Sequence, residues 1–262
     1  MANIIRSAKS GSDWTNNELN SYNIKIVSKN DVEFFGEVLE SLPKSISHEL
    51  LEYDFSSGEE RPERYAELLI LLNSASTGLE NKVDSFASML LRASGYIKKD
   101  RVIGMREILN LVICGESRFA QTDVSVLGSE GSTILLVQED KRIDKKAKDP
   151  EPQVIAEAIA AFQKNNKDRI ESNLEEIDSM TIPCITMKGT FPIFYLVPVT
   201  SELSNCIIGG IYPSNVTEVF RYAPDIPIKE GMKLVESRRE VLQCYESFKK
   251  FVDDLEEQLR RE

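Results

Sequence analysis

The stretch STILLVQEDKR, residues 132–142, decides how this chain folds. Its four consecutive apolar residues, Ile134 to Val137, are typical of a strand buried on both faces of a sheet. Three charged residues follow almost at once, Glu139, Asp140 and Lys141. Because an unpaired charge at the end of a buried strand is costly, we expect these groups either to form an ion pair at the strand end or to build a site.

The patterns on both sides of this strand predict an α/β fold. Apolar residues at helical spacing predict a helix over 79–94, and a second helix follows Pro152. Between them, alternating runs bounded by Gly-containing turns predict three strands in an antiparallel meander, namely Ile108 to Cys114, Asp123 to Leu127, and Thr133 to Glu139. Farther along, Ile182 to Met187 and Ile193 to Val199 resemble a hairpin, with Pro192 and Pro198 placing its second strand at a sheet edge.

Four segments are predicted along the chain. Residues 1–21 are polar and rich in Ser and Asn, and they read as a flexible tail. Residues 22–77 form an N-terminal helical extension, residues 78–232 the core, and residues 233–262 a long C-terminal helix. Within the extension we expect a strand from Tyr22 to Val27 and helices from Asp31 to Leu42 and from Glu63 to Leu72.

The C-terminal helix carries apolar residues at the alternating spacing of four and three that is typical of a coiled-coil seam. This seam comprises Leu234, Val241, Tyr245, Phe248, Val252, Leu255 and Leu259. It has two interpretations, because the helix can pack on its own chain or form a homodimer.

Composition limits the function. Lys and Arg total 32 against 43 Asp and Glu, and the net charge of −11 repels polyanions, so contact with a nucleic acid must be local. The four cysteines are widely spaced, which suggests neither a disulfide framework nor a zinc site and indicates an intracellular protein, cytoplasmic or nuclear. No stretch reaches the roughly 20 apolar residues of a membrane span.

The charged strand end predicts a metal site. Asp123 opens the neighbouring predicted strand, so its carboxylate can meet that of Glu139 at the same end of the sheet. Carboxylate oxygens are preferred ligands of Mg²⁺, and Lys141, two residues after Glu139, can then assist a water molecule and neutralise a phosphate.

Asp123 followed by Glu139-x-Lys141, on strands between two helices, resembles the PD-(D/E)XK superfamily of restriction-endonuclease-like nucleases. The resemblance implies an α-β-β-β-α-β core with a mixed sheet flanked by helices, and cleavage of a phosphodiester with Mg²⁺ or Mn²⁺. It implies Asp123, Glu139 and the Asp140 carbonyl as metal ligands and Lys141 as the partner of the attacking water. Thr122 stands where the family pattern has a proline.

The same resemblance implies helper groups from the two flanking helices. Glu80 matches the family's first-helix glutamate, with Asp84 as its substitute. Gln153 and Glu157 match the positions at which the family carries a glutamine in the helix after the motif. First-turn acidic residues also favour a helix dipole, and Gln153 and Glu157 also suit a solvated face. Segments across roughly residues 62–252 are further similar to a group of uncharacterised fungal proteins.

A basic run follows the motif, and it has two interpretations. It can contact a phosphate backbone or form a solvated loop. Its substrate-binding candidates are Arg142, Lys145 and Lys146. For the whole chain the alternative to a nuclease is a catalytically inactive, nuclease-like binding or scaffolding module.

Overall fold

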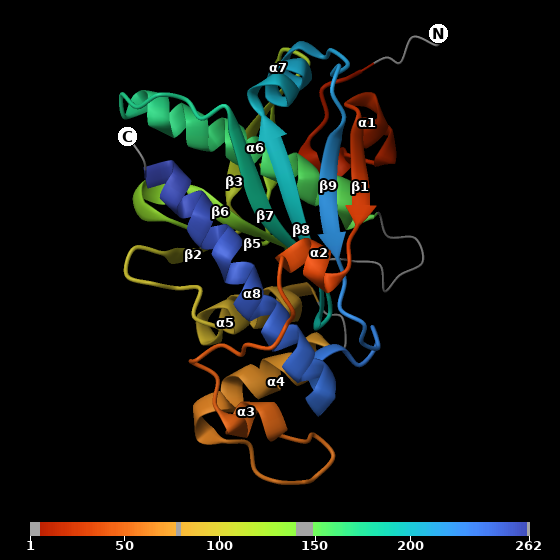
Figure 1. The fold of residues 1–262 in the computed structure, drawn as a ribbon, viewed down its shortest axis with the longest axis vertical. Helices are drawn as coiled ribbons and strands as arrows, with labels where there is room; N and C mark the ends of the chain where they lie inside the picture. The colour runs from red at the N-terminus through yellow and green to blue at the C-terminus, as the bar shows by residue number, and fades with distance from the viewer. Residues whose placement is uncertain (1–5, 77–79, 140–148, 261–262) are drawn as a thin grey trace.

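A seven-stranded mixed sheet organises the protein in the computed structural model, which describes residues 6–76, 80–139 and 149–260 (Figure 1). The strands are β1 (Ile24–Ser28), β2 (Val102–Met105), β3 (Ile108–Ile113), β4 (Glu116–Gln121), β5 (Val124–Leu127), β6 (Thr133–Glu139), β7 (Ser179–Lys188), β8 (Phe191–Thr200) and β9 (Thr217–Tyr222). The α-helices are α1 (Asn16–Ser21), α2 (Asp31–Phe35), α3 (His48–Glu52), α4 (Ala66–Ala75), α5 (Glu80–Ala93), α6 (Pro150–Glu171), α7 (Ser201–Gly209) and α8 (Val235–Arg260).

The strand order in the main sheet is β1-β9-β8-β7-β6-β5-β2, and β3 and β4 form a separate two-stranded sheet. β6 runs parallel to β7 and β1 runs parallel to β9, whereas the other neighbours are antiparallel. The chain passes from β6 to β7 through α6, as a parallel pair requires.

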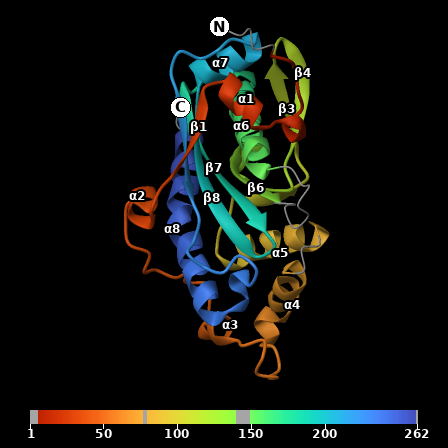
Figure 2. The same ribbon diagram turned by 90° about the vertical axis from the view of Figure 1, so that its right-hand side faces the viewer.

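Helices cover both faces of the sheet (Figure 2). α6 lies on one face together with the β3–β4 hairpin, and α8 crosses the other face. Successive residues of β8 contact the layers on opposite faces of the sheet. Phe194 packs on Phe248 of α8, whereas the Tyr195 hydroxyl donates a hydrogen bond to Glu151 of α6. α6 begins where the Asp149 carboxylate caps it and Pro150 occupies its first turn.

The predicted pairing around the opening stretch is partly confirmed. β5 and β6 are antiparallel neighbours, with Val124 opposite Val137, and the helices predicted over 79–94 and after Pro152 are present. The placement of Ile108 to Cys114 in the meander was wrong, because β3 pairs with β4 and β2 takes its place beside β5. The alternating burial of β3 reflects its packing on α6, and such alternation does not specify which strand a segment pairs with.

The description of residues 1–21 as a flexible tail was wrong for its described part. Trp14 is buried and stacks on Tyr22, and Thr15 and Glu18 form a capping box that starts α1. Some of the polar residues in this segment therefore cap α1. β1 also pairs with β9, so residues 22–77 contribute a strand to the main sheet and are not a purely helical extension.

Two other predicted elements were too long or misplaced. The helix expected from Asp31 to Leu42 ends at Phe35, because Gly36 adopts a left-handed conformation with φ of 73°. The second strand of the late hairpin is present, but β8 lies inside the sheet. Its pairing with β9 covers only 194–196, so Pro192 and Pro198 flank that ladder, where a strand tolerates a missing N–H.

α8 uses its apolar seam within its own chain. The seam residues inside the helix, from Val241 to Leu259, are buried against the sheet and α3. Leu234 lies before the helix and is 37% exposed. The interpretation of intramolecular packing is therefore confirmed, and these side chains are not available for a dimer. Among the described helices, none is long and apolar enough to span a bilayer.

Candidate functional site

Asp123 lies directly before β5 and contacts the end of β6. The register that pairs Val124 with Val137 brings Gln138 beside Asp123, and the Gln138 amide donates to Asp123 Oδ2 at 2.5 Å. Both residues therefore lie on the face of the sheet that α6 covers. Gln138 is 3% exposed, and its Oε1 atom has no hydrogen-bond partner among the described residues.

Most of the residues predicted as metal ligands or catalytic groups lie outside the part of the chain that the structure describes. The side chains of Glu80 and Glu139 are not described, although their backbones begin α5 and end β6. The other predicted site residues outside the described ranges are Asp140, Lys141, Arg142, Lys145 and Lys146. The meeting of Asp123 with the Glu139-x-Lys141 motif therefore stays a prediction.

The first turns of α6 place a second carboxyl group near Asp123. Gln153 and Glu157 lie one turn apart, and the Gln153 amide donates to Glu157 Oε1 at 3.0 Å. Glu157 is fully buried, and its Oε2 atom has no partner among the described residues. Burial raises the pKa of Glu157 well above its usual range, the hydrogen bond from Gln153 opposes this, and the charge of Asp123 raises the pKa further. Burial and the charge of Asp123 therefore favour the protonated form of Glu157.

A pocket of about 260 Å³ opens over these groups. Its walls come from residues before α1, from β4, from the turn before β3 and from the start of α6. The lining residues are Ser12, Arg106, Phe119, Gln121, Asp123, Gln138 and Gln153. Asp123 and Gln153, both predicted from the sequence, thus line the same pocket.

The amides of the pocket present oxygen atoms. The side-chain nitrogens of Gln121, Gln138 and Gln153 donate to the Arg106 carbonyl, to Asp123 and to Glu157 respectively. Each amide nitrogen is thereby used as a donor, which leaves the amide oxygen as an acceptor. Such a set attracts a hard cation or a hydrogen-bond donor. Within the described residues, however, no group of three or more His, Cys, Asp or Glu side chains could hold a metal ion.

Arg106 links the pocket to helix α5 through its contact with Asp84. It has a positive φ of 54° in the turn before β3, and its guanidinium lies 4.0 Å from the Asp84 carboxylate. Asp84 is 5% exposed, so the residue proposed as a substitute for Glu80 is buried beside the pocket's arginine. The sequence reasoning missed Arg106, Gln121 and Gln138. Gln138 becomes identifiable only once the pairing of Val124 with Val137 is known.

A polar network continues from the pocket across the sheet. Glu151, in the first turn of α6, accepts hydrogen bonds from the Tyr195 hydroxyl and from Arg221 Nε, each at 2.9 Å. Tyr195 also approaches Thr186, which stands opposite Gln138 in the β6–β7 register. Burial, and next the charge of Glu151, raise the pKa of Tyr195, so its hydroxyl stays protonated. Tyr195 of β8 and Arg221 of β9 thus hold the start of α6 on the sheet.

The pocket thus combines a carboxylate, amide side chains and an arginine at the end of adjoining strands, with the buried Glu157 behind Gln153. Such an arrangement suits binding of a cation together with a phosphate. Comparison of the chain with protein-family models and with curated proteins finds no match, so the geometry and the sequence motif carry the functional argument.

Proposed function

We propose that this protein is a metal-dependent phosphodiesterase of the PD-(D/E)XK type that acts on a nucleic acid. The order of elements supports the proposal: α5, β2, β5, β6, α6 and β7 follow each other as α-β-β-β-α-β, with the β3–β4 hairpin inserted after β2. In the sheet these strands are neighbours in the order β2-β5-β6-β7. This order is the one expected for the restriction-endonuclease-like core that the sequence resemblance implies, and on that ground it supports the proposal.

The observation that carries the proposal is the acceptor-lined pocket around Asp123 between β5, β6 and α6. The donor chemistry fits a hard divalent cation, because Gln138 and Asp123, which line the same pocket, both carry side-chain oxygen atoms. Glu139 and the Asp140 carbonyl would complete the ligand set from the end of β6. Because Gln138 stands on the Asp123 face, the Glu139 carboxylate would have to reach the site around the strand end. Glu80 would be an added ligand or base. When bound, Mg²⁺ or Mn²⁺ would act as a Lewis acid on the phosphate and make water more acidic.

The chain's own residues have distinct roles in this proposal. Gln138 orients the Asp123 carboxylate through its hydrogen bond, and Gln153 is held in place by Glu157. Lys141 would hold the attacking water and neutralise charge on the phosphate. Arg106, with a side chain 63% exposed at the pocket, can contact the same phosphate. The basic residues Arg142, Lys145 and Lys146 would bind the adjacent backbone locally.

Calorimetric titration with Mn²⁺ tests the metal site. We expect the parent protein to bind Mn²⁺, and we expect Asp123→Ala and Glu139→Ala to weaken binding by at least about tenfold, because each removes a charged ligand. Glu176→Ala, an exposed carboxylate outside the pocket, is the matched control and should bind as the parent does. A parent protein that binds no Mn²⁺ would end the metal proposal.

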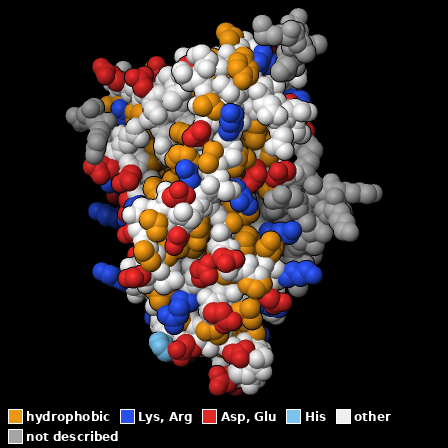
Figure 3. Space-filling view, turned by 45° about the vertical axis from the view of Figure 1, so that its right-hand side comes forward, with side chains coloured by type: hydrophobic (Ala, Val, Ile, Leu, Met, Phe, Trp, Pro, Cys, Tyr) orange, Lys and Arg blue, Asp and Glu red, His pale blue; other side chains and the backbone are white. Residues whose placement is uncertain are grey.

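The alternative is a nuclease-like module that binds without turnover. It is favoured by Gln138, because a neutral side chain stands in register with Asp123. Figure 3 also shows acidic side chains among the basic ones on the face it presents, so this face is not a continuous basic surface. Assays on single-stranded and double-stranded DNA and RNA separate the two functions. Mn²⁺-dependent cleavage that Lys141→Ala abolishes supports the nuclease, and binding without cleavage supports the module.

A further inference from the structure

β3 pairs with β4 along one of its edges, and its other edge faces away from β4. In β3, the Val112 N–H donates to Gln163 Oε1 at 2.8 Å, and the Val112 carbonyl accepts from Gln163 Nε2 at 3.2 Å. The Cys114 N–H donates in the same direction, to the Ile207 carbonyl of α7. Since strand residues alternate, the even-numbered residues of β3 direct their backbone groups away from β4.

Ile108 and Asn110 share this orientation, and their outward backbone groups are open. Within the described part of the chain, nothing occupies the place beside them that Gln163 takes beside Val112. A groove of about 820 Å³ runs along this edge between β3, α6 and α7. Gln163 thus makes with Val112 the two hydrogen bonds that a neighbouring strand would make.

The walls of the groove match an extended peptide. Ile108 and Ile170 are 69% and 54% exposed, and Ile208 and Val112 also line the groove. Open strand edges of this kind recruit further strands unless they are covered or charged, and apolar pockets beside them select alternate side chains.

The charges in the groove favour a basic partner. Lys164 pairs with Asp168 at 2.6 Å and Lys167 pairs with Glu171 at 3.7 Å, so both lysines are neutralised locally. The groove is also lined by Glu176 and Asp178, for which the described residues provide no ion-pair partner. The groove therefore carries a net negative charge next to open N–H and C=O groups.

We propose that an extended peptide segment, with lysine or arginine alternating with aliphatic residues, binds along β3 as a third strand. Its backbone pairs with Ile108 and Asn110, its aliphatic side chains contact Ile108 and Ile170, and its basic side chains meet Glu176 and Asp178. Ile108 pairs with Gln121, which lines the Asp123 pocket, so the peptide ends close to the proposed active site. The inference does not depend on metal binding or on cleavage.

Amide exchange measured by NMR tests the pairing, with a fluorescein-labelled octapeptide of alternating lysine and valine as the probe. We expect the peptide to slow exchange of the Ile108 and Asn110 amides and leave that of Leu109, which already faces β4, unchanged. A block peptide of four lysines followed by four valines is the composition control and should protect neither amide. Unchanged exchange at both amides would overturn the proposal.

Two variants test the same site by fluorescence anisotropy. Asn110→Pro removes an outward N–H but no bond to β4, so the hairpin should form, as its thermal unfolding will check. We expect it to weaken peptide binding by at least about tenfold, and Asn110→Ala, which keeps the N–H, to bind as the parent does. Asp178→Ala should weaken binding at low salt and lose that effect at high salt.

Other outcomes would overturn the inference. Equal binding by Asn110→Pro and the parent would show that the peptide is held by charge alone. If the parent self-associates in size-exclusion chromatography and Asn110→Pro does not, while neither binds the peptide, then the edge pairs with a second copy of this chain. Metal-dependent cleavage would be unaffected in either case, so this proposal and the proposed function fail independently.

Discussion

Glu157 is a carboxyl group enclosed between α6 and the sheet, where a charge has little solvation. Its neighbours, Gln153 and Cys184, are uncharged at pH 7, because an amide does not ionise and burial raises the pKa of the Cys184 thiol. The nearest charged influence on Glu157 is Asp123, which has the same sign as ionised Glu157. Ionisation of Glu157 is therefore opposed both by lost hydration and by repulsion.

Replacing Glu157 by glutamine tests this protonation state. The folded pKa lies above the usual value of 4.5, so the folded chain keeps a proton that the unfolded chain releases above that pH. The parent should therefore lose stability as pH rises from 5 to 8, with a slope of at most about 1.4 kcal/mol per pH unit from this group. Glu157→Gln should remove that slope and gain stability relative to the parent at pH 8, as measured by urea unfolding.

The control for this prediction is Glu171→Gln on the same helix. Glu171 is exposed and pairs with Lys167, so its substitution should change stability by less than about 0.5 kcal/mol at every pH. Parallel stability curves for Glu157→Gln and the parent between pH 5 and 8 would mean that Glu157 is ionised inside the fold.

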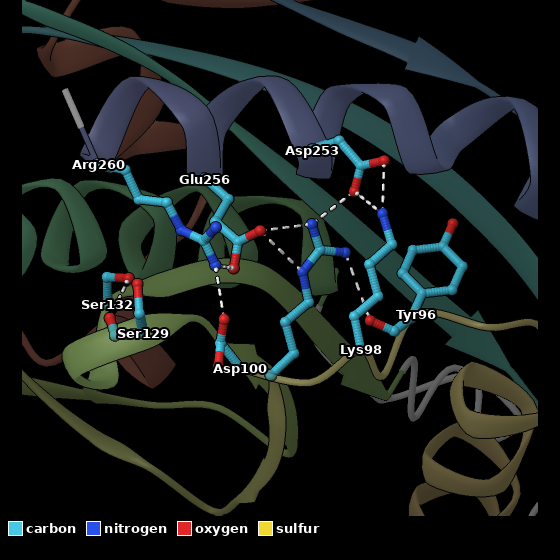
Figure 4. A network of polar contacts seen from close by, with 9 residues as sticks. Tyr96, Lys98, Asp100, Ser129, Ser132, Asp253, Glu256 and Arg260 are labelled. Atoms are coloured by element: carbon cyan, nitrogen blue, oxygen red, sulfur yellow. Dashed lines mark hydrogen bonds and ion pairs between the residues drawn. The ribbon is translucent and has the colours of Figure 1, made fainter.

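Arg101 is a buried charge that joins the loop before β2 to Asp253 and Glu256 of α8, the two carboxylates labelled on the helix in Figure 4. Its side chain is 1% exposed and lies 2.9 Å from Glu256 and 2.5 Å from Asp253. Arg101→Ala leaves the buried Glu256 carboxylate without this partner, so we expect a loss of about 3 kcal/mol in urea unfolding. Lys98→Ala removes a half-exposed contact to the same Asp253 and should cost less than about 1 kcal/mol. Equal losses would show that burial does not distinguish the two pairs.

At the residue scale, the sequence predicted Asp123 as a metal ligand from its place at the start of a strand and Gln153 as a helper group from the family resemblance, and both line the pocket. It could not predict Gln138, since the position that faces Asp123 depends on the register between β5 and β6. One residue of slip exchanges Gln138 for Glu139 on that face. Arg106 could not be predicted from the sequence either, because a single arginine in a turn belongs to no periodic pattern.

At the scale of elements, α8 provides much of the core on one face of the sheet. Phe248 is fully buried and packs on Phe34, Phe194 and Phe251. Helix and sheet thus share a cluster of aromatic rings, and the hydrophobic seam that suggested a coiled coil is used to build it.

Truncating Phe248 tests this assignment. Phe248→Ala should lower the free energy of unfolding by about 3 to 5 kcal/mol, because it leaves a cavity among aromatic rings. Arg239→Ala, at an exposed position of α8, should change it by less than about 0.5 kcal/mol. Size-exclusion chromatography should show no dimer dissociation in Phe248→Ala. A dimeric parent that becomes a stable, folded monomer in this variant would contradict intramolecular packing.

Long periodic elements were predictable from the sequence, and short ones were not. α5, α6, α8, β6 and the β7–β8 hairpin each have enough residues for the apolar pattern to be read. β2 has four residues, of which only Gly104 is buried, so it shows no hydrophobic pattern. The late segments α7 and β9 were missed as well, because β9 is only partly buried and its place between β1 and β8 is set by tertiary pairing.

At the scale of the whole molecule, the α-β-β-β-α-β unit is only part of a larger sheet. β8, β9 and β1 extend it on one side, and the β3–β4 hairpin stands apart from it over α6. The extra strands lie away from the Asp123 pocket, whereas residues before α1 and the hairpin help to line that pocket. The additions to the core therefore shape the proposed site as well as enlarge the sheet.

The pairing of β1 with β9 joins residues 24–28 to residues 217–221, and α8 covers the sheet only after both are in place. On a ribosome, β1 emerges first and must wait for most of the chain before its partner exists. Until then the apolar strands β6 to β8 are without their final covering helix. Strands β6 to β8 therefore gain their final cover only after α8 has left the ribosome, and chaperones have access to them until then.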